Sequence, residues 1–173
     1  WIVRQAPGIG RELYAPHLEA GRIELDDEPI LRLASRARIV VSASGTASFE
    51  AALTGTPLVV VYRTHPLTFR LLRRMVRVPH IAMANLAAGR AIVPEVLQED
   101  CTSERVAEEV ALLLSDAPLR AEMKRALGEL RERFGPAGAY DRAARRVRAH
   151  LGEAGIPGAG AATAAQPPGG GHR

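Results

Sequence analysis

Short apolar runs alternate with amphipathic stretches along the first half of the chain. The stretch TPLVVVY at 56–62 is almost entirely apolar and rich in β-branched residues, which is typical of a strand buried on both faces of a parallel sheet. Other short apolar runs predict strands at 1–6, 22–25, 38–43 and 80–84. Apolar residues at helical spacing predict helices at 10–19, 26–37, 46–54 and 66–77.

Strands that alternate with helices of this length predict βαβ units, because two parallel strands need a crossover that is usually a helix. The fold class that we expect is therefore α/β, with a Rossmann-like parallel sheet and helices on both faces. We expect a loop at 85–94 and then a helix that Pro94 opens. Further along, the pattern predicts helices only, at 102–115, 117–134 and 137–150.

The composition changes near residue 150. Residues 151–173 are mainly Gly, Ala and Pro, and such a segment cannot bury enough apolar surface to become ordered. We therefore predict one domain at 1–150 and a disordered tail at 151–173. The chain opens with WIVRQAP, which has the pattern of a strand already under way, so we expect a fragment whose N-terminal part is missing.

Composition and charge exclude several classes of protein. The 173 residues are 47% hydrophobic, yet no apolar run approaches the ~20 residues of a membrane-spanning helix. Cys101 is the only cysteine, which excludes an internal disulfide, and the histidines lack the spacing of a metal site. The pI of about 10.0 favours an acidic partner. Nucleic acid is not expected, because aromatic residues at 4% provide no stacking platform.

The stretch SASGTASFE at 42–50 joins a predicted strand to a predicted helix through a glycine turn. Ligands of open parallel sheets bind outside the carboxyl ends of the strands, and the N–H groups at a helix start favour an anion such as phosphate. We expect Ser44 or Thr46 to cap the helix and Gly45 to let the backbone approach a ligand. Taken alone, such a turn is more often a plain helix cap.

Glu50 favours a binding site over a plain cap. A capping box would need Ser or Thr three residues before the acid, and that position holds Ala47. Helical side chains lean toward the N-terminus, so the Glu50 carboxylate should face the turn, where it could accept hydrogen bonds from a ribose diol. Phosphate at the turn and ribose at Glu50 describe a nucleoside diphosphate. Arg63 ends the next strand and is either a solvated residue or a cation that faces the diphosphate.

The stretch NLAAGRAIVPEVLQED at 85–100 is the most distinctive in the chain. Asn85 and Gln98 at a loop rim could read the donor and acceptor edge of a base or sugar, although each alone is more often a cap or a surface group. Three stretches in order resemble the lipid-A-disaccharide synthase family: SGTASFEAALTGTPLVVVYR, PLTFRLLRRMVRVPHIAMANLAAGR and VPEVLQED. The resemblance covers about residues 2–149.

The resemblance implies the C-terminal domain of a GT-B glycosyltransferase, an architecture in which two Rossmann-like domains face a cleft. Family members join UDP-2,3-diacylglucosamine to 2,3-diacylglucosamine 1-phosphate (lipid X) and release UDP, with no metal or cofactor implied. The implied donor-binding residues are Ser44, Gly45, Thr46, Glu50, Arg63, Asn85, Gly89, Arg90, Glu95 and Gln98. The resemblance assigns the catalytic base to the missing N-terminal half, so no catalytic residue is named and the fragment is expected to be inactive.

Four arginines share one face of the helix predicted at 66–77: Arg70, Arg73, Arg74 and Arg77. Such a run is usually a solvated face. Without an interleaved acid the four charges repel one another, and phospholipid headgroups or the acceptor's phosphate would relieve that repulsion. We therefore expect peripheral attachment to the cytoplasmic face of the bacterial inner membrane. A homodimer is left open.

Two other functions are left open. Another UDP-sugar GT-B enzyme, such as a peptidoglycan glycosyltransferase or a UDP-sugar epimerase, would share the glycine turn and the acid but is not expected to carry NLAAGR. A non-catalytic nucleotide-binding module is weakly favoured by the basic pI. Titration with UDP, UDP-acylglucosamine and RNA separates these functions.

Overall fold

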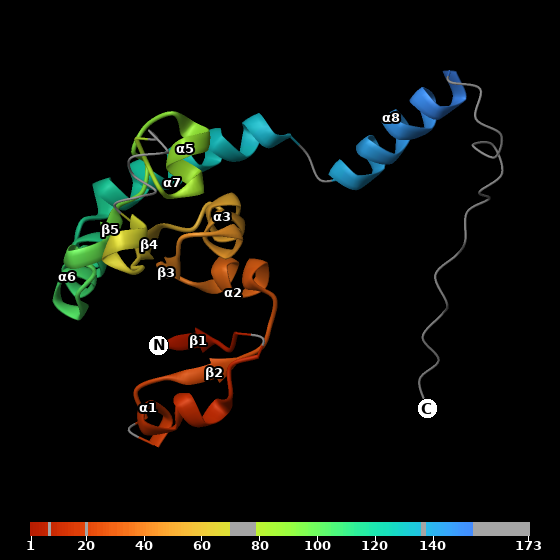
Figure 1. Ribbon diagram of the computed structural model, residues 1–173. Coiled ribbons are helices and arrows are strands. Elements are labelled where there is room, and N and C mark those ends of the chain that lie inside the picture. The colour runs from red at the N-terminus through yellow and green to blue at the C-terminus, as the bar shows by residue number, and fades with distance from the viewer. Residues whose placement is uncertain (7, 20, 70–78, 136–137, 154–173) are drawn as a thin grey trace. The chain divides into compact units, whose positions relative to one another are not determined.

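The computed structural model describes residues 1–6, 8–19, 21–69, 79–135 and 138–153. The chain divides into two units, Trp1–Phe134 and Gly135–Arg173 (Figure 1). The domain expected at 1–150 and the tail expected at 151–173 stay predictions.

Parallel strands form two sheets in the first unit. The strands β1 (Ile2–Arg4) and β2 (Glu24–Asp26) pair in parallel. The second sheet has the order β3-β4-β5, with β3 at Val40–Ala43, β4 at Leu58–Tyr62 and β5 at Glu95–Leu97. Both pairings of this sheet are parallel. The α/β prediction is confirmed, although the strands divide between two sheets.

The helices fall close to the predicted ranges over most of the chain. The described helical elements are η1 (Arg11–Leu13), α1 (Ala15–Glu19), α2 (Ile30–Arg36), α3 (Thr46–Leu53), α5 (Met83–Ala88), η2 (Gln98–Asp100), α6 (Ser103–Ser115), α7 (Ala117–Phe134) and α8 (Ala139–Glu153). Residues 66–69 are also helical. The rest of the helix predicted at 66–77, and with it the four arginines of the stripe, lies outside the described residues.

Two predicted elements are wrong. The strand expected at 80–84 does not form: residues 80–82 precede α5, and Met83 begins it. The helix also takes in residues 85–88 of the expected loop and ends at Gly89 in the left-handed conformation with φ 71°. Ala and Met favour a helix intrinsically, and glycine is the usual residue at such a C-terminal cap. Conversely, residues 95–97 form β5 and not a helix, because they pair with β4 and complete its burial.

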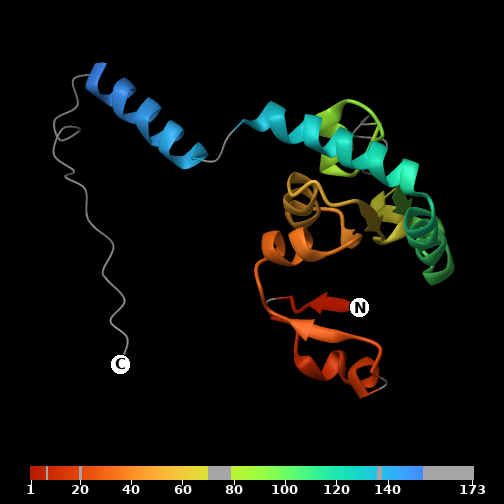
Figure 2. The same cartoon turned by 180° about the vertical axis from the view of Figure 1, so that it is seen from behind.

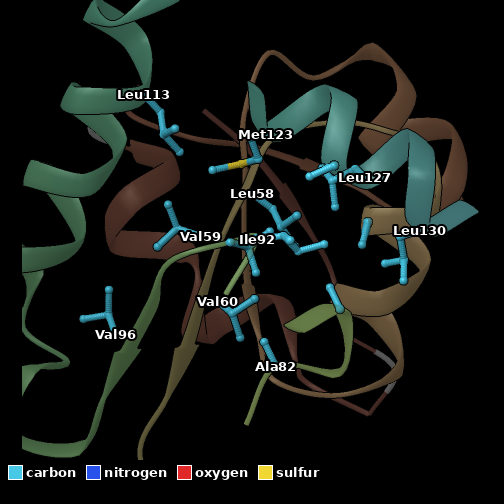
Figure 3. Packing of buried hydrophobic residues seen from close by; sticks show 14 of the residues in the cluster. Leu58, Val59, Val60, Ala82, Ile92, Val96, Leu113, Met123, Leu127 and Leu130 are labelled. Carbon is cyan, nitrogen blue, oxygen red and sulfur yellow. The ribbon is translucent and has the colours of Figure 1, made fainter. Parts of the chain in front are cut away.

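The hydrophobic core surrounds β4, whose residues Leu58, Val59 and Val60 are fully buried. Side chains alternate along a strand, and in Figure 3 Leu58 and Val60 lie on the α7 side whereas Val59 lies on the α6 side. The residues of α6 and α7 that complete the core are Val110, Leu113, Met123, Ala126, Leu127 and Leu130. Burying each large side chain contributes about 1.5–3 kcal/mol, so β4 is the firmest element on which a site could be placed.

The end of α7 contacts the helix that follows the glycine turn. The rings of Phe49 and Phe134 lie edge to face, with centroids 5.2 Å apart and planes inclined at 75°. The Arg133 guanidinium donates to the Ala87 carbonyl of α5 at 3.5 Å. Figure 2 shows α7 running past α3 and α5. These contacts fix α3 and α5 against the same long helix.

The second unit contains α8, an amphipathic helix whose described side chains are mostly exposed, including Tyr140 at 92% and Val147 at 57%. The helix ends at Glu153, three residues beyond the predicted boundary, and the remainder of the expected tail lies outside the described residues. Along the described part of the chain, no helix is both long and apolar enough to cross a bilayer.

Candidate functional site

The carboxyl ends of β3, β4 and β5 meet at one edge, because all three strands run in parallel and in register. The residues that leave this edge are Ser44 after β3, Arg63 after β4 and Gln98 after β5. Open parallel sheets bind ligands outside this edge. The sequence therefore predicted correctly that the glycine turn and Arg63 leave the same sheet edge.

The glycine turn has a conformation that only glycine adopts readily. Gly45 has φ 150° and ψ −164° and is the N-cap residue of α3. Its N–H donates to the Ser48 hydroxyl at 3.2 Å, and that hydroxyl donates to the Gly45 carbonyl at 2.7 Å. The expected capping by Ser44 or Thr46 is wrong, because Ser48 closes the turn.

The start of α3 is open to a ligand. A Cβ atom added to Gly45 would meet no atom of the described residues within 4 Å. The N–H groups of Thr46 and Ala47 have no acceptor among the described residues, and Thr46 is exposed. Unsatisfied N–H groups with the positive end of a helix dipole favour an anion. The turn therefore has the donors that a phosphate group requires.

Ser44 connects this turn to the segment that precedes α5. Its N–H donates to the Val61 carbonyl at 2.9 Å, and its hydroxyl donates to the Ile81 carbonyl at 3.0 Å. The contact partner on residue 81 is a backbone atom, so the residue type at that position gave no signal in the sequence.

Glu50 lies one helical turn after Thr46 on the same face of α3 and is half-buried. Reciprocal capping of α3 uses Ser48, so the Glu50 carboxylate is not needed for it. Within the described part of the chain, this carboxylate has no hydrogen bond and no ion pair. It is therefore available to accept hydrogen bonds from a ligand.

Gln98 fixes the backbone beside Arg63 and does not present its amide to open space. It is 5% exposed; its Oε1 accepts from the Thr64 N–H at 2.8 Å, and its Nε2 donates to the Thr64 carbonyl at 3.2 Å. Its φ of 51° is unusual for a residue other than glycine. Arg63 itself is exposed and forms no ion pair among the described residues.

Asn85 is fully buried and uses its whole amide inside the protein. Its Oδ1 accepts from the N–H groups of Ile92 at 2.7 Å and Val93 at 2.9 Å. Its Nδ2 donates to the Val93 carbonyl at 2.9 Å and to Glu95 Oε1 at 2.7 Å. Asn85 therefore holds the loop 89–94 in place, and its side chain has no surface with which to contact a donor.

Glu95 begins β5, and its carboxylate lies at the start of α5. Oε2 accepts from the Ile81 N–H at 3.0 Å, and Oε1 accepts from the Ala82 N–H at 3.1 Å. His80 Nδ1 lies 3.7 Å from Oε1, and the two side chains are 21% and 11% exposed. These contacts were not apparent in the sequence, because Glu95 was expected on a helix.

Gly89 and Arg90 lie at the opposite end of α5. Gly89 terminates the helix, and Arg90 Nη2 lies 3.5 Å from Glu129 Oε2 of α7. The six residues of α5 span ~9 Å, so these two residues are separated from the segment that contacts the glycine turn. The predicted residues at or directly after the sheet edge are Ser44, Gly45, Thr46 and Arg63, and Glu50 lies one helical turn further along α3.

The family model and three relatives that match this chain have nearly the same name. The model of the family described as lipid-A-disaccharide synthetase matches residues 22–140. The lipid-A-disaccharide synthase of Syntrophotalea carbinolica is 40% identical over 121 residues, which is 70% of this chain and 31% of that protein. The synthase of Koribacter versatilis is 39% identical over 146 residues, which is 80% of this chain and 38% of that protein.

The synthase of Trichlorobacter lovleyi is 44% identical over 105 residues, or 61% of this chain and 27% of that protein. The chain thus spans about a third of the length of the curated relatives that it matches.

Proposed function

The chain belongs to the lipid-A-disaccharide synthetase family, and we therefore propose that it binds the UDP-sugar donor of a glycosyltransferase of lipid A biosynthesis. The donor proposed is UDP-2,3-diacylglucosamine and the acceptor 2,3-diacylglucosamine 1-phosphate. Their condensation forms a β-1,6-linked disaccharide and releases UDP. The expected site residues at the carboxyl edge of the β3-β4-β5 sheet support this role.

The observation that carries the proposal is an unpartnered carboxylate one helical turn beyond an open glycine turn. In our proposal the diphosphate accepts hydrogen bonds from the free N–H groups at the start of α3, and the ribose hydroxyls donate to Glu50. The exposed Arg63 supplies a cation at the same edge. In this proposal three residues support the surrounding backbone, because each accepts hydrogen bonds from backbone N–H groups: Asn85, Glu95 and Gln98.

The proposed role in catalysis is stabilisation of the leaving group. When the bond between the anomeric carbon and the diphosphate breaks, negative charge grows on the departing UDP. Fixed N–H donors and a nearby arginine stabilise such charge without reorganising during the reaction. The base that removes the proton from the acceptor hydroxyl is not assigned to a residue of this chain.

Replacing Glu50 tests the proposed site. Hydrogen bonds to a charged group contribute about 1.5–3 kcal/mol each, so Glu50→Ala should weaken the binding of UDP and of uridine by at least about tenfold. Glu122→Ala, which removes an exposed carboxylate of α7, is the matched control and should leave both affinities unchanged. Ligand-observed NMR titration measures them. Equal affinity in the Glu50 variant and the unaltered chain would refute the ribose contact.

We also propose that the protein attaches to an anionic membrane surface through the arginine stripe. The motivation is the unbalanced positive charge of Arg70, Arg73, Arg74 and Arg77. Changing Arg73 and Arg74 to Glu should abolish cosedimentation with vesicles that contain anionic phospholipid. The control is the same exchange at two exposed arginines outside the stripe, Arg32 of α2 and Arg131 of α7. Undiminished cosedimentation of the stripe variant would remove this proposal.

A further inference from the structure

Glu95 is a nearly buried carboxylate with three hydrogen-bond donors. It accepts from the Ile81 N–H at 3.0 Å, the Ala82 N–H at 3.1 Å and Asn85 Nδ2 at 2.7 Å. Its side chain is 11% exposed, so it offers little surface to a ligand. A carboxylate held in this way is strongly oriented, because each donor fixes one lone-pair direction.

The backbone of Ile81 connects Glu95 to the glycine turn. Glu95 holds the Ile81 N–H, and the Ile81 carbonyl accepts the Ser44 hydroxyl at 3.0 Å. Ser44 immediately precedes Gly45, whose N–H and carbonyl are fixed by Ser48. A rigid path of hydrogen bonds thus runs from β5 to the N-terminus of α3.

We propose that Glu95 is a positioning residue that holds the diphosphate-binding turn in its binding conformation through Ile81 and Ser44, without touching the donor itself. The inference rests on the proposed function. Donors that are fixed before the ligand arrives bind and stabilise developing charge without a cost of reorganisation. Loss of the Glu95 contact should let the 80–82 segment move and release the Ser44 hydroxyl.

The same contacts explain how an anionic side chain can lie near a site for an anion. A carboxylate without compensating donors would repel a nearby diphosphate in a partly buried environment. The charge of Glu95 is instead distributed over the N–H groups at the start of α5 and over Asn85, with His80 Nδ1 at 3.7 Å. Glu95 can therefore position the turn while hydrogen bonds from within the protein stabilise its own charge.

Glu95→Gln tests the inference with little change of shape. The glutamine amide has one acceptor oxygen, so its NH₂ group must face an N–H donor that Glu95 now satisfies. We expect UDP affinity to fall about tenfold, consistent with a lost hydrogen bond to a charged group, while uridine affinity stays unchanged. Glu99→Gln, an exposed neighbour, should alter neither. Equal losses of UDP and uridine affinity would overturn the positioning role.

A double-mutant cycle tests the route through Ser44. If Glu95 acts through Ile81 and Ser44, the variant with both Glu95→Gln and Ser44→Ala should bind UDP no more than about twofold more weakly than the worse single variant. Fully additive losses would show that Glu95 acts by another route. The combination of Glu95→Gln with Glu50→Ala should be additive, since the two residues serve different parts of the nucleotide.

Hydrogen exchange of the ligand-free chain tests the same path without UDP. Glu95→Gln should speed exchange of the hydrogen-bonded amides at Ser44, Gly45 and 81–82 and leave β4 protected. If exchange rises there but the unaltered chain does not bind UDP, the donor function fails while the positioning of the turn stands. If the chain binds UDP through Glu50 but exchange at Ser44 and Gly45 is unchanged, the positioning role alone is refuted.

Discussion

Asn85 shows how a buried amide can determine a loop without contacting a ligand. It satisfies the N–H groups of Ile92 and Val93 and the Val93 carbonyl. Asn85→Ala would leave buried backbone groups without partners, so we expect the free energy of unfolding to fall by on the order of 3 kcal/mol. Urea denaturation measures the change. Gln5→Ala removes an exposed hydrogen bond from the side-chain amide to the Ile9 carbonyl. It should lower the free energy of unfolding by less than about 1 kcal/mol.

Gly45 is the residue at which backbone conformation alone should decide the effect of a substitution. Space is available for a methyl group, but φ 150° with ψ −164° lies in a region that costs other residues about 1–3 kcal/mol. We expect Gly45→Ala to destabilise the chain by this amount and to weaken UDP binding as the turn relaxes. Gly128→Ala in α7 has equal space and an ordinary φ; a comparable loss there would contradict the argument.

At the scale of single residues, the sequence predicted the glycine turn and the helix that follows it, but not that Ser48 closes the turn. Gly45 and Glu50 could be placed because turn chemistry and helical direction depend on neighbours in the chain. Asn85 and Gln98 were expected at a ligand, yet both bind backbone groups, at Val93 and Thr64 respectively. A sequence shows that an amide is present but not which buried backbone group requires it.

At the scale of elements, α7 is fixed by one apolar face. Leu127 is fully buried, and its truncation would remove core contacts and leave a cavity. We expect Leu127→Ala to lower the free energy of unfolding by about 2–5 kcal/mol. Leu114→Ala, at a position that is 44% exposed on α6, is the matched control and should cost less than about 1 kcal/mol. Similar losses for both variants would show that the core is arranged differently.

The elements that sequence predicted best are those with long or strong patterns. The run around Val59 and Val60 identified the central strand, and the longer helices α6 and α7 agree with the predictions to within one residue. Short apolar runs were ambiguous. A strand was predicted where α5 begins, and a helix was predicted where β5 lies. Pairing with β4 decides the conformation of 95–97, and that tertiary contact is absent from any local pattern.

At the scale of the whole molecule, we expect nucleotide binding without turnover. The chain corresponds to about a third of the length of its relatives, and no general base is assigned within it. Mixing the chain with both acylated sugar substrates should release no UDP, as a coupled assay would measure, although UDP itself binds. Steady UDP release above a heat-denatured control would show that these residues suffice for transfer.

The edge-to-face contact of Phe49 with Phe134 limits where the first unit can be shortened. Phe134 is the last residue of that unit, and its ring packs beside the residue that precedes Glu50. A polypeptide that stops at Arg133 would lose this aromatic support for α3, whereas one that stops at Phe134 would retain it. A single residue at the carboxyl terminus thus separates a trimmed domain in which an aromatic ring still supports α3 from one in which that support is lost.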